Sequence, residues 1–330
     1  MAITIKDIAR MAGVSTTTVS KIINKKDNNI SQKTRDKVMS FINEYNYIPS
    51  NIARSMVTKR SNTIGLIIPD VCNPFLPELA RGVEDEAGRE AYSVFFCNTD
   101  ESLAKEIASV QALNEKMVEG IVIVPAIIRD NEQELKLTTK IPMVTIDREA
   151  NYSNIVGRVI TDNYTGSYEA VQYLIAKNHK KIAFISGPIN IMPSVERKRG
   201  YLTACRDAGL EASDSDIYIG QFDPAWGEQA IDMLNRDYTA FFCGNDLIAA
   251  GVIKGLAKKG IKVPNQVSVI GFDDITLASY LHPELTTVRQ ESYEIGRQSA
   301  KILFDSIKNK DTNIKDLTLK AKLIIRNSTN

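Results

Sequence analysis

The 330 residues include only two histidines and four cysteines. The cysteines lie far apart in the sequence and form no CxxC pair. A zinc site, a disulfide framework and histidine-based catalysis each need more of these residues or a closer spacing, so the composition argues against all three. Free cysteines suit a reducing compartment, which indicates a cytoplasmic protein.

Long apolar runs and catalytic motifs are missing as well. No stretch approaches the roughly 18 apolar residues of a membrane-spanning helix, and the first residues lack the apolar core of an export signal. The sequence contains no G-x-S-x-G elbow, no P-loop lysine and no HExxH pair. We therefore expect no membrane association, no metal, no cofactor and no enzymatic activity. An enzyme and a periplasmic receptor are the alternatives that these absences disfavour.

The net charge of +1 conceals a strong asymmetry along the chain. Residues 1–60 carry 11 Lys and Arg against 4 Asp and Glu, whereas residues 61–330 carry 30 against 36. A basic head on an acidic body favours a module that binds a polyanion such as nucleic acid. A charged surface that is merely solvated would give the same count. The sequence motifs are therefore needed to choose between a nucleic-acid-binding module and a solvated surface.

The basic head contains two short helical patterns separated by a glycine. A capping box at residues 4–7 opens the first pattern, and Gly13 ends it. The polar run that begins at Ser15 can cap a second helix, whose apolar face includes Val19 and Ile22. This is the helix-turn-helix arrangement, in which the second helix enters the major groove of DNA.

The hydroxyls and the lysine at the start of the second helix are suited to hydrogen bonding with base edges. The head residues that we expect to contact DNA are Thr4, Ser15, Thr16, Thr17, Thr18, Ser20, Lys21 and Asn24. A third helix fits residues 31–45, with Val38, Phe41, Ile42 and Tyr45 on one face. A three-helix interaction module that binds no DNA is the alternative at this point.

The motifs of the head resemble those of the lac repressor (LacI) family of bacterial transcription regulators, the ribose repressors in particular. The resemblance extends over the whole chain and is carried by Thr4-Ile5-Lys6-Asp7-Ile8-Ala9, Gly13-Val14-Ser15, Thr18-Val19-Ser20 and the segment 49–56. It implies a repressor that binds a palindromic operator as a homodimer, since a symmetric site needs two heads.

In that family the segment after Pro49 is a hinge helix that folds on operator DNA. The residues that would contact DNA from this hinge are Asn51, Ala53, Arg54 and Met56. Met56 stands where the family usually has a leucine that wedges into the minor groove. Methionine is also able to unstack base steps, so we expect the wedge to persist; packing against the partner's hinge is the alternative.

From residue 62 onward the pattern changes to alternating strands and helices. The candidate strands are 64–68, 94–97, 121–124, 143–146, 182–185, 217–219, 240–243 and 267–270, with a strand-like segment at 286–289. Most are separated by roughly 20–30 residues, the spacing of right-handed βαβ crossovers. We therefore expect an α/β fold with parallel sheets that helices cover on both faces.

Four parts are expected along the chain, the last two being Rossmann-like subdomains of the kind found in periplasmic sugar-binding proteins. The helix-turn-helix domain takes residues 1–48, and the hinge helix with its linker takes 49–61. The N-terminal core subdomain takes 62–161 plus about 291–321. The C-terminal core subdomain takes 162–290 plus about 322–330.

Polar and aromatic side chains follow the strand ends, where the ligands of parallel sheets gather. Planar bidentate groups suit vicinal hydroxyls, and aromatic faces suit the C–H side of a neutral sugar. The residues are Asn73, Phe75, Asp147, Arg148, Arg197, Phe222, Asn245, Asp273 and Gln290. Taken singly they also have structural interpretations, such as an ion pair within 147–148, core packing of the phenylalanines, and helix capping by the nearby Asp70 and Asp246.

The same nine residues resemble, in order, the ligand-contacting pattern of the ribose-binding proteins. Leu76 departs from that pattern, which has a second phenylalanine there, and this leaves room for another pentose or a hexose. The resemblance implies a sugar effector, with ribose favoured, that releases the repressor from its operator. We expect Arg197 and Asp273 to face each other across the cleft, and Asp274 to cap a helix. Control by a protein corepressor, as in the catabolite control branch of the family, is the main rival.

Overall fold

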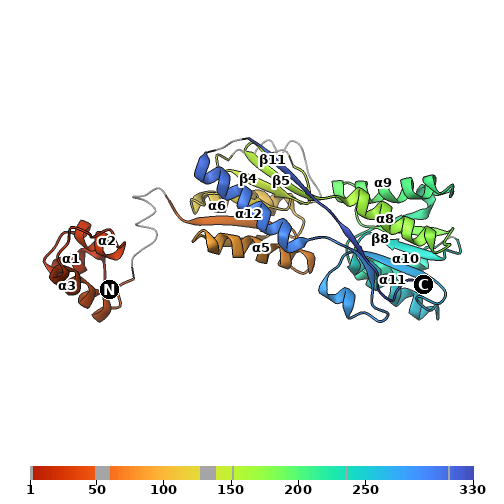
Figure 1. Ribbon diagram of the computed structural model, residues 1–330, viewed down its shortest axis with the longest axis horizontal. Helices are drawn as coiled ribbons and strands as arrows, with labels where there is room; N and C mark the ends of the chain where they lie inside the picture. The colour runs from red at the N-terminus through yellow and green to blue at the C-terminus, as the bar shows by residue number, and fades with distance from the viewer. Residues whose placement is uncertain (1–2, 49–59, 127–138, 151, 235, 311–312) are drawn as a thin grey trace. The chain divides into compact units, whose positions relative to one another are not determined.

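The computed structural model describes residues 3–48, 60–126, 139–150, 152–234, 236–310 and 313–330 (Figure 1). The chain divides into two compact units, Met1–Ser61 and Asn62–Asn330, called here the head and the core. The four hinge candidates at 51–56 lie outside the described residues. Within the described part of the chain, no helix has the length and apolar character that crossing a membrane requires.

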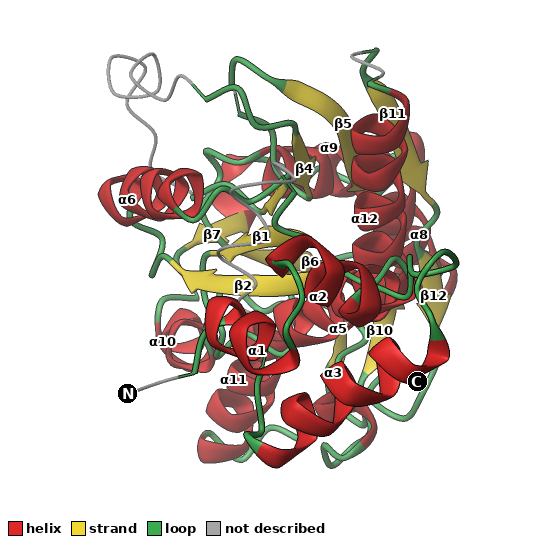
Figure 2. Cartoon of the chain, turned by 90° about the vertical axis from the view of Figure 1, so that its left-hand side faces the viewer, coloured by secondary structure: helices red, strands yellow, loops and turns green. Residues whose placement is uncertain are grey.

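The described part of the head contains the helices α1 (Ile5–Ala12), α2 (Thr16–Ile23) and α3 (Gln32–Glu44) (Figure 2). The capping box is present, because the Asp7 carboxylate accepts from both the N–H and the hydroxyl of Thr4. Gly13 ends α1 with a φ of 70°, a left-handed conformation that costs glycine little. The Ser15 hydroxyl accepts from the N–H of Thr18 and caps α2.

A small apolar core holds these helices together. Ile8, Val19 and Val38, one from each helix, are completely buried. The third helix ends at Glu44, one residue before the predicted end, so Tyr45 is the C-cap residue and is 43% exposed, with its ring centroid 6.5 Å from that of Phe41. Tyr47, two residues further on, packs against the core instead. Because α3 ends at Glu44, Tyr45 does not continue the helix face that packs on the core.

The core contains two six-stranded sheets. The first sheet has the order β11-β5-β4-β3-β1-β2, and all its strands are parallel. Its strands are β1 (Thr63–Ile68), β2 (Ser93–Asn98), β3 (Ile121–Ile123), β4 (Met143–Ile146), β5 (Ile155–Thr161) and β11 (Lys315–Leu319). Helices α5 (Phe75–Arg89) and α12 (Ser292–Asn309) cover one face, and α6 (Leu103–Glu115) covers the other.

The second sheet has the order β12-β10-β9-β8-β6-β7, in which only β12 runs antiparallel to its neighbour. Its strands are β6 (Ile182–Ser186), β7 (Ile217–Ile219), β8 (Ala240–Cys243), β9 (Ser268–Asp273), β10 (Thr286–Arg289) and β12 (Lys322–Ile324). The helices α8 (Asn163–Ala176) and α9 (Met192–Asp207) cover one face, and α10 (Pro224–Asp232) and α11 (Asp246–Lys258) cover the other.

The expected α/β architecture with parallel, doubly covered sheets is confirmed. All nine sequence-based strands are present, although β9 runs on to Asp273 rather than ending at 270. The strands β5, β11 and β12 were not predicted. The last two are short and begin with a lysine, and they form because an existing sheet edge offers them hydrogen-bond partners.

The chain passes from one sheet to the other three times. The passages are at 161–163 between β5 and α8, at 289–292 between β10 and α12, and at 319–322 between β11 and β12. Figure 1 shows the last of these in dark blue, near the C-terminus. Because the chain crosses from one sheet to the other in these passages, their residues are placed to sense any movement of one sheet against the other.

Candidate functional site

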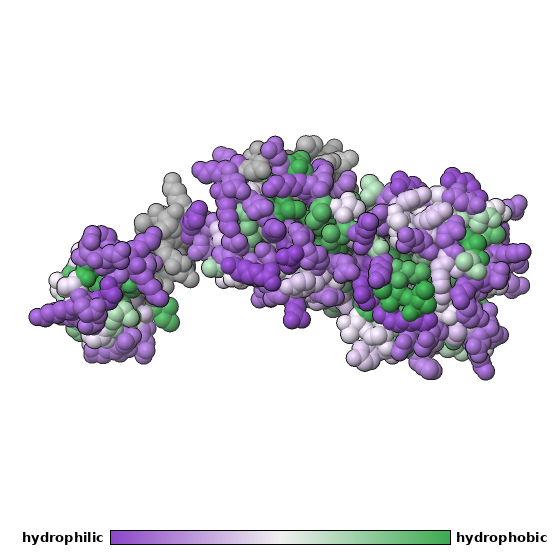
Figure 3. Space-filling model, in the orientation of Figure 1, coloured by the Kyte–Doolittle hydropathy of each residue, from purple (hydrophilic) through white to green (hydrophobic). Residues whose placement is uncertain are grey.

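The expected DNA-contacting side chains of the head fall into two groups. Those of Thr16, Thr17 and Lys21 are exposed on α2. The others hydrogen-bond close by: Thr4 with Asp7, Ser15 with Thr18, and Asn24 with Ser20. The visible surface of the head is largely hydrophilic (Figure 3). Thr16, Thr17 and Lys21 are therefore the α2 residues best able to reach base edges. Thr4, Ser15 and Asn24 are exposed as well, but their hydrogen bonds shape the helix ends.

One pocket of the core brings together all ten residues that the sequence suggested for an effector. It encloses about 380 Å³, counting the part that is open to solvent. The lining residues are Asn73, Phe75, Leu76, Asp147, Arg148, Ile191, Pro193, Arg197, Phe222, Asn245, Asp273 and Gln290. The first five lie at the carboxyl ends of β1 and β4 in the first sheet, and the other seven lie at the second sheet. This convergence follows from parallel topology, which places strand ends together.

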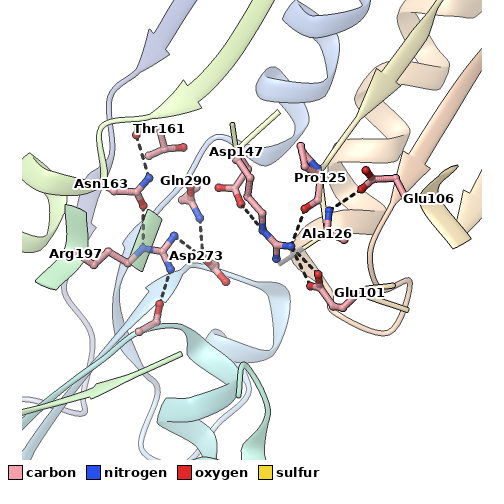
Figure 4. A network of polar contacts seen from close by, with 12 residues as sticks. Glu101, Glu106, Pro125, Ala126, Asp147, Thr161, Asn163, Arg197, Asp273 and Gln290 are labelled. Atoms are coloured by element: carbon pink, nitrogen blue, oxygen red, sulfur yellow. Dashed lines mark hydrogen bonds and ion pairs between the residues drawn. The ribbon is translucent and has the colours of Figure 1, made fainter. Parts of the chain in front are cut away.

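Arg148 follows β4 and is the cation on the first-sheet side of the pocket. Its Nη1 donates to both carboxylate oxygens of Glu101, at 2.8 and 3.0 Å, and to the carbonyl of Pro125, at 2.9 Å (Figure 4). Its Nε lies 3.7 Å from the carboxylate of Asp147, so the suggested ion pair within 147–148 exists. Burial raises the pKa of Asp147, while the two pocket arginines oppose the shift. Asp147 and Arg148 can therefore form an ion pair with each other and still line a ligand-binding pocket.

Arg197 is the cation on the second-sheet side, and it is 3% exposed. Its Nε donates to the Asn163 side-chain oxygen at 2.8 Å, and its Nη1 donates to the carbonyl of Gly244. The guanidinium carbon lies 3.8 Å from the ring centroid of Phe272. Its Nη2 lies 3.9 Å from Oδ1 of Asp273. The expectation that these two residues face each other across the cleft is wrong. Arg197 lies on α9, which covers the second sheet, and Asp273 ends β9 of that same sheet.

Asp273 combines a buried charge with a strained backbone. Its φ is 110°, a region that residues other than glycine rarely occupy. The side-chain amide of Gln290 donates to its Oδ1 at 2.7 Å. Burial raises the pKa of Asp273 to about 7, against the opposing effects of Arg197 and Gln290. Strain and a shifted pKa in one residue are typical of sites selected for binding.

Two asparagines present their amide groups to the pocket in a fixed way. The Asn245 side-chain oxygen accepts from the N–H of Ile248 at 2.8 Å and caps α11. The Asn73 side-chain oxygen accepts from the N–H of Phe75 at 3.2 Å. Since the oxygens are used in this way, the NH₂ groups are the parts that can donate to a ligand.

Aromatic and aliphatic side chains supply the rest of the lining. Phe75 is buried, in agreement with the core-packing interpretation, and Leu76 beside it is buried as well. Phe222 lies so close to Gly187 that a Cβ there would come within 2.4 Å of its ring. Glycine at 187 is therefore required for this ring position.

Three acidic residues near the strand ends make contacts other than helix capping, so the expectation for Asp274 is wrong and the alternative interpretation of Asp70 and Asp246 does not hold. Asp70 accepts from the N–H of Cys72. Asp246 is fully buried and accepts from the N–H of Ile275 and the hydroxyl of Thr287. Asp274 binds two arginines, Arg289 and Arg326, each at 2.7 Å.

Three residues at the site were missed from the sequence: Ile191, Pro193 and Asn163. The first two are apolar and belong to the start of α9, so no polar signature marks them. Asn163 could have been found, because it follows the Ile- and Val-containing run 155–161, which was not recognised as a strand.

Comparisons with known proteins agree with this organisation. Residues 4–50 match the family described as bacterial regulatory proteins, lacI family, and residues 171–329 match the periplasmic binding protein-like domain. The HTH-type transcriptional repressor PurR of Aliivibrio fischeri is 35% identical over 333 residues, covering 98% of both chains. The ribose operon repressor of Halalkalibacterium halodurans is 35% identical over 329 residues, covering 99% of this chain and 97% of the relative. The chain belongs to the lacI family.

Solved structures of lacI-family proteins resemble most or all of the chain. A lac repressor dimer bound to operator and the anti-inducer ONPF has a TM-score of 0.87 at 25% identity, covering 100% of this chain and 99% of that one. A LacI family transcriptional regulator from Enterococcus faecium with bound ribose has a TM-score of 0.71 at 30% identity, covering 81% of this chain and 98% of that one.

Membership of the lacI family makes this protein a DNA-binding transcriptional repressor. The helix-turn-helix of its head is the α1–α2 pair, with Gly13 in the turn. Residues 171–329, in the core, match the periplasmic binding protein-like domain.

Proposed function

We propose that this repressor binds a palindromic operator as a dimer, through α2 and the hinge residues, and is released by a neutral sugar that occupies the pocket. D-ribose is the favoured effector. The observation that carries the proposal is the charge balance of the pocket lining. Asp147 and Asp273 face Arg148 and Arg197 within one small volume. An anionic ligand would meet two carboxylates there, whereas a polyol offers hydroxyls that donate to them and accept from the arginines.

A buried acceptor without a partner supports a ligand rich in hydroxyls. Among the described residues, the side-chain oxygen Oε1 of Gln290 has no hydrogen-bond partner, although its amide nitrogen holds Asp273. Leaving such a group unpaired costs roughly 1–3 kcal/mol. A hydroxyl of the effector would satisfy it.

The backbone of the pocket supports the same conclusion. Asp147 and Asp273 have φ values of 62° and 110°, in the left-handed half of conformational space. Conformations of this kind persist where a function selects them, because they cost of order 1–3 kcal/mol each. These two residues line the pocket, one at each sheet, and the φ of Asp273 is the largest among the twelve described non-glycine residues that have a positive φ.

Relatives favour ribose among the neutral sugars. One relative is named as a ribose operon repressor, and one similar structure holds ribose. Leu76 provides a smaller wall than a phenylalanine would, so a pentose with a substituent, or a hexose, is the alternative ligand. A protein corepressor would use the outside of the core and would have no need of these buried polar groups.

Titration calorimetry with the full-length protein tests the proposal. We expect heat and a rise in Tm with D-ribose, and much weaker binding of ribose 5-phosphate, because its phosphate would meet Asp147 or Asp273. Operator affinity, measured by fluorescence anisotropy, should fall when ribose is added. Absence of any heat and of any thermal shift at millimolar ribose would remove ribose from the proposal. Tight binding of the phosphate ester would contradict the charge-balance argument.

A further inference from the structure

Asn163 lies at the first of the three passages between the sheets. It is the first residue of α8, it follows the end of β5 by two residues, and it is 5% exposed. The backbone N–H of its neighbour Asp162 donates to the carbonyl of Leu319 at 2.8 Å, which joins the first passage to the third. Asn163 therefore belongs to the part of the core that must change if the two sheets move relative to each other.

The two ends of the Asn163 amide bind on different sides of this passage (Figure 4). Its oxygen accepts from Nε of Arg197 at 2.8 Å, on the second-sheet side. Its nitrogen donates to the carbonyl of Thr161 at 3.1 Å, at the end of a first-sheet strand. A single planar group thus links a pocket arginine to the backbone of the other subdomain.

The contacts of the Arg197 guanidinium determine which of its N–H groups can bind a ligand. Asn163 binds Nε, and the carbonyl of Gly244 binds Nη1. The Phe272 ring lies against the flat face of the guanidinium. The Nη2 group, near Asp273, is the part that is left to donate to a hydroxyl. A shift of Arg197 toward a bound sugar would therefore pull on Asn163 and, through it, on Thr161.

We propose that Asn163 is a positioning residue that couples effector binding at Arg197 to the passage between the sheets. It does not have to touch the sugar. This role rests on the proposed function, since it deepens how the sugar acts. It predicts that sugar affinity and the effect of sugar on operator binding can be separated at this one position.

Asn163→Asp is the variant that separates them. A carboxylate keeps the acceptor for Arg197 but has no N–H for the carbonyl of Thr161, which it repels. Sugar affinity should therefore stay within about threefold of the wild type, while the fold-change in operator affinity on saturation with ribose should fall severalfold. Asn163→Ala loses both contacts, so we expect about tenfold weaker ribose binding together with reduced coupling.

Gln172→Ala is the matched control. Gln172 lies on the same helix, and its side-chain amide donates to the carbonyl of Ala204 on α9 at 3.1 Å, away from the pocket. This variant removes an amide contact between α8 and α9, so a merely structural effect would appear in both. We expect its ribose affinity and its coupling to match the wild type.

The measurements are calorimetry with D-ribose and operator anisotropy with and without saturating ribose, on full-length protein. Preserved ribose binding with reduced coupling in Asn163→Asp supports the inference. Coupling equal to that of the wild type in this variant overturns it, and so does an equal loss of coupling in Gln172→Ala. A wild-type protein that binds ribose tightly without any change in operator affinity overturns the proposed release mechanism itself, and the role of Asn163 falls with it.

Discussion

The guanidinium of Arg197 and the carboxylate of Asp273 lie 3.9 Å apart on the same side of the pocket, and a side-chain amide holds each of them. Asn163 holds the arginine and Gln290 holds the aspartate. The two amides come from different passages between the sheets. The charged pair is thus oriented by the segments that connect the subdomains, so pocket chemistry and subdomain movement are linked by direct hydrogen bonds.

Ribose affinity should depend on pH through Asp273. Burial raises its pKa to about 7, so this acceptor is mostly protonated at pH 6 and mostly ionised at pH 8. If the ionised form binds the sugar hydroxyls, affinity should be roughly tenfold weaker at pH 6 than at pH 8. Calorimetry at pH 6, 7 and 8 measures this directly.

Asp273→Asn provides the control for that dependence. Its ribose affinity should be weaker than that of the wild type and flat over this pH range, because an amide does not titrate here. The raised pKa also fixes a sign for stability: the folded chain holds this proton more tightly than the unfolded chain does. The contribution of Asp273 to the free energy of unfolding is therefore complete below its ordinary pKa of 3.8 and is lost as pH rises through 7. A steeper pH dependence of unfolding in the variant than in the wild type would contradict the assignment.

The strain at Asp273 should be measurable by comparing two substitutions. Asp273→Gly and Asp273→Ala both remove the carboxylate, and both should abolish strong ribose binding. Glycine accepts a φ of 110° without penalty, so the glycine variant should be more stable by about 1 kcal/mol or more in urea unfolding. Arg206, in the last turn of α9, is the control position, where alanine should be the more stable residue. Equal stability of the two Asp273 variants would show that the backbone relaxes there at no cost.

Glu106 should stabilise the segment 125–126, whose Pro125 carbonyl binds Arg148. It is completely buried on α6, and its carboxylate accepts from the N–H of Ala126 and the hydroxyl of Tyr152. Glu106→Ala leaves these donors behind and should cost about 2–4 kcal/mol of unfolding free energy. Because the neighbouring carbonyl of Pro125 binds Arg148, ribose affinity should fall as well.

A conservative variant and a surface variant make that experiment specific. Glu106→Gln should recover most of the stability, since its amide keeps one acceptor and the Tyr152 hydroxyl can turn to accept. Glu115→Ala, at the exposed end of the same helix, should change stability by less than about 0.5 kcal/mol. If Glu106→Ala were as stable as Glu115→Ala, these buried contacts would contribute nothing.

Thr17 should read bases rather than anchor the backbone. Its side chain is exposed in the first turn of α2, which enters the major groove in this type of head. Thr17→Ala should lower the preference for the operator over a single-base variant by about 1 kcal/mol, or roughly fivefold, and leave the salt dependence of binding unchanged.

Arg54→Ala serves as the contrast for Thr17, because a cation of the hinge should act on all sequences alike. It should weaken the operator and its variants equally and reduce the slope of log K against log salt by about one unit. Competition binding over a series of salt concentrations distinguishes the two patterns. A uniform loss in Thr17→Ala would place that residue on a phosphate instead.

The local elements and the chemistry of the pocket follow from the amino-acid sequence alone. Ser15, Gly13 and the capping box specify the ends of the head helices through contacts within four residues, which depend on little else. Alternating strands and helices specify parallel sheets, and parallel sheets bring strand ends together. For that reason the sequence pattern suffices to assign Asn73, Arg148 and Arg197 to one site.

The contacts within that site depend on the tertiary structure. Arg197 and Asp273 share one sheet, rather than opposing each other across the pocket, because α9 packs back over β6 toward the end of β9. Tyr45 is exposed and Tyr47 packs against the core of the head, because α3 ends at Glu44, before both residues. Asn163 gained its position from β5, a strand that the sequence analysis missed. Contacts of this kind form between segments that are far apart in the sequence. A local sequence pattern cannot predict how such segments pack.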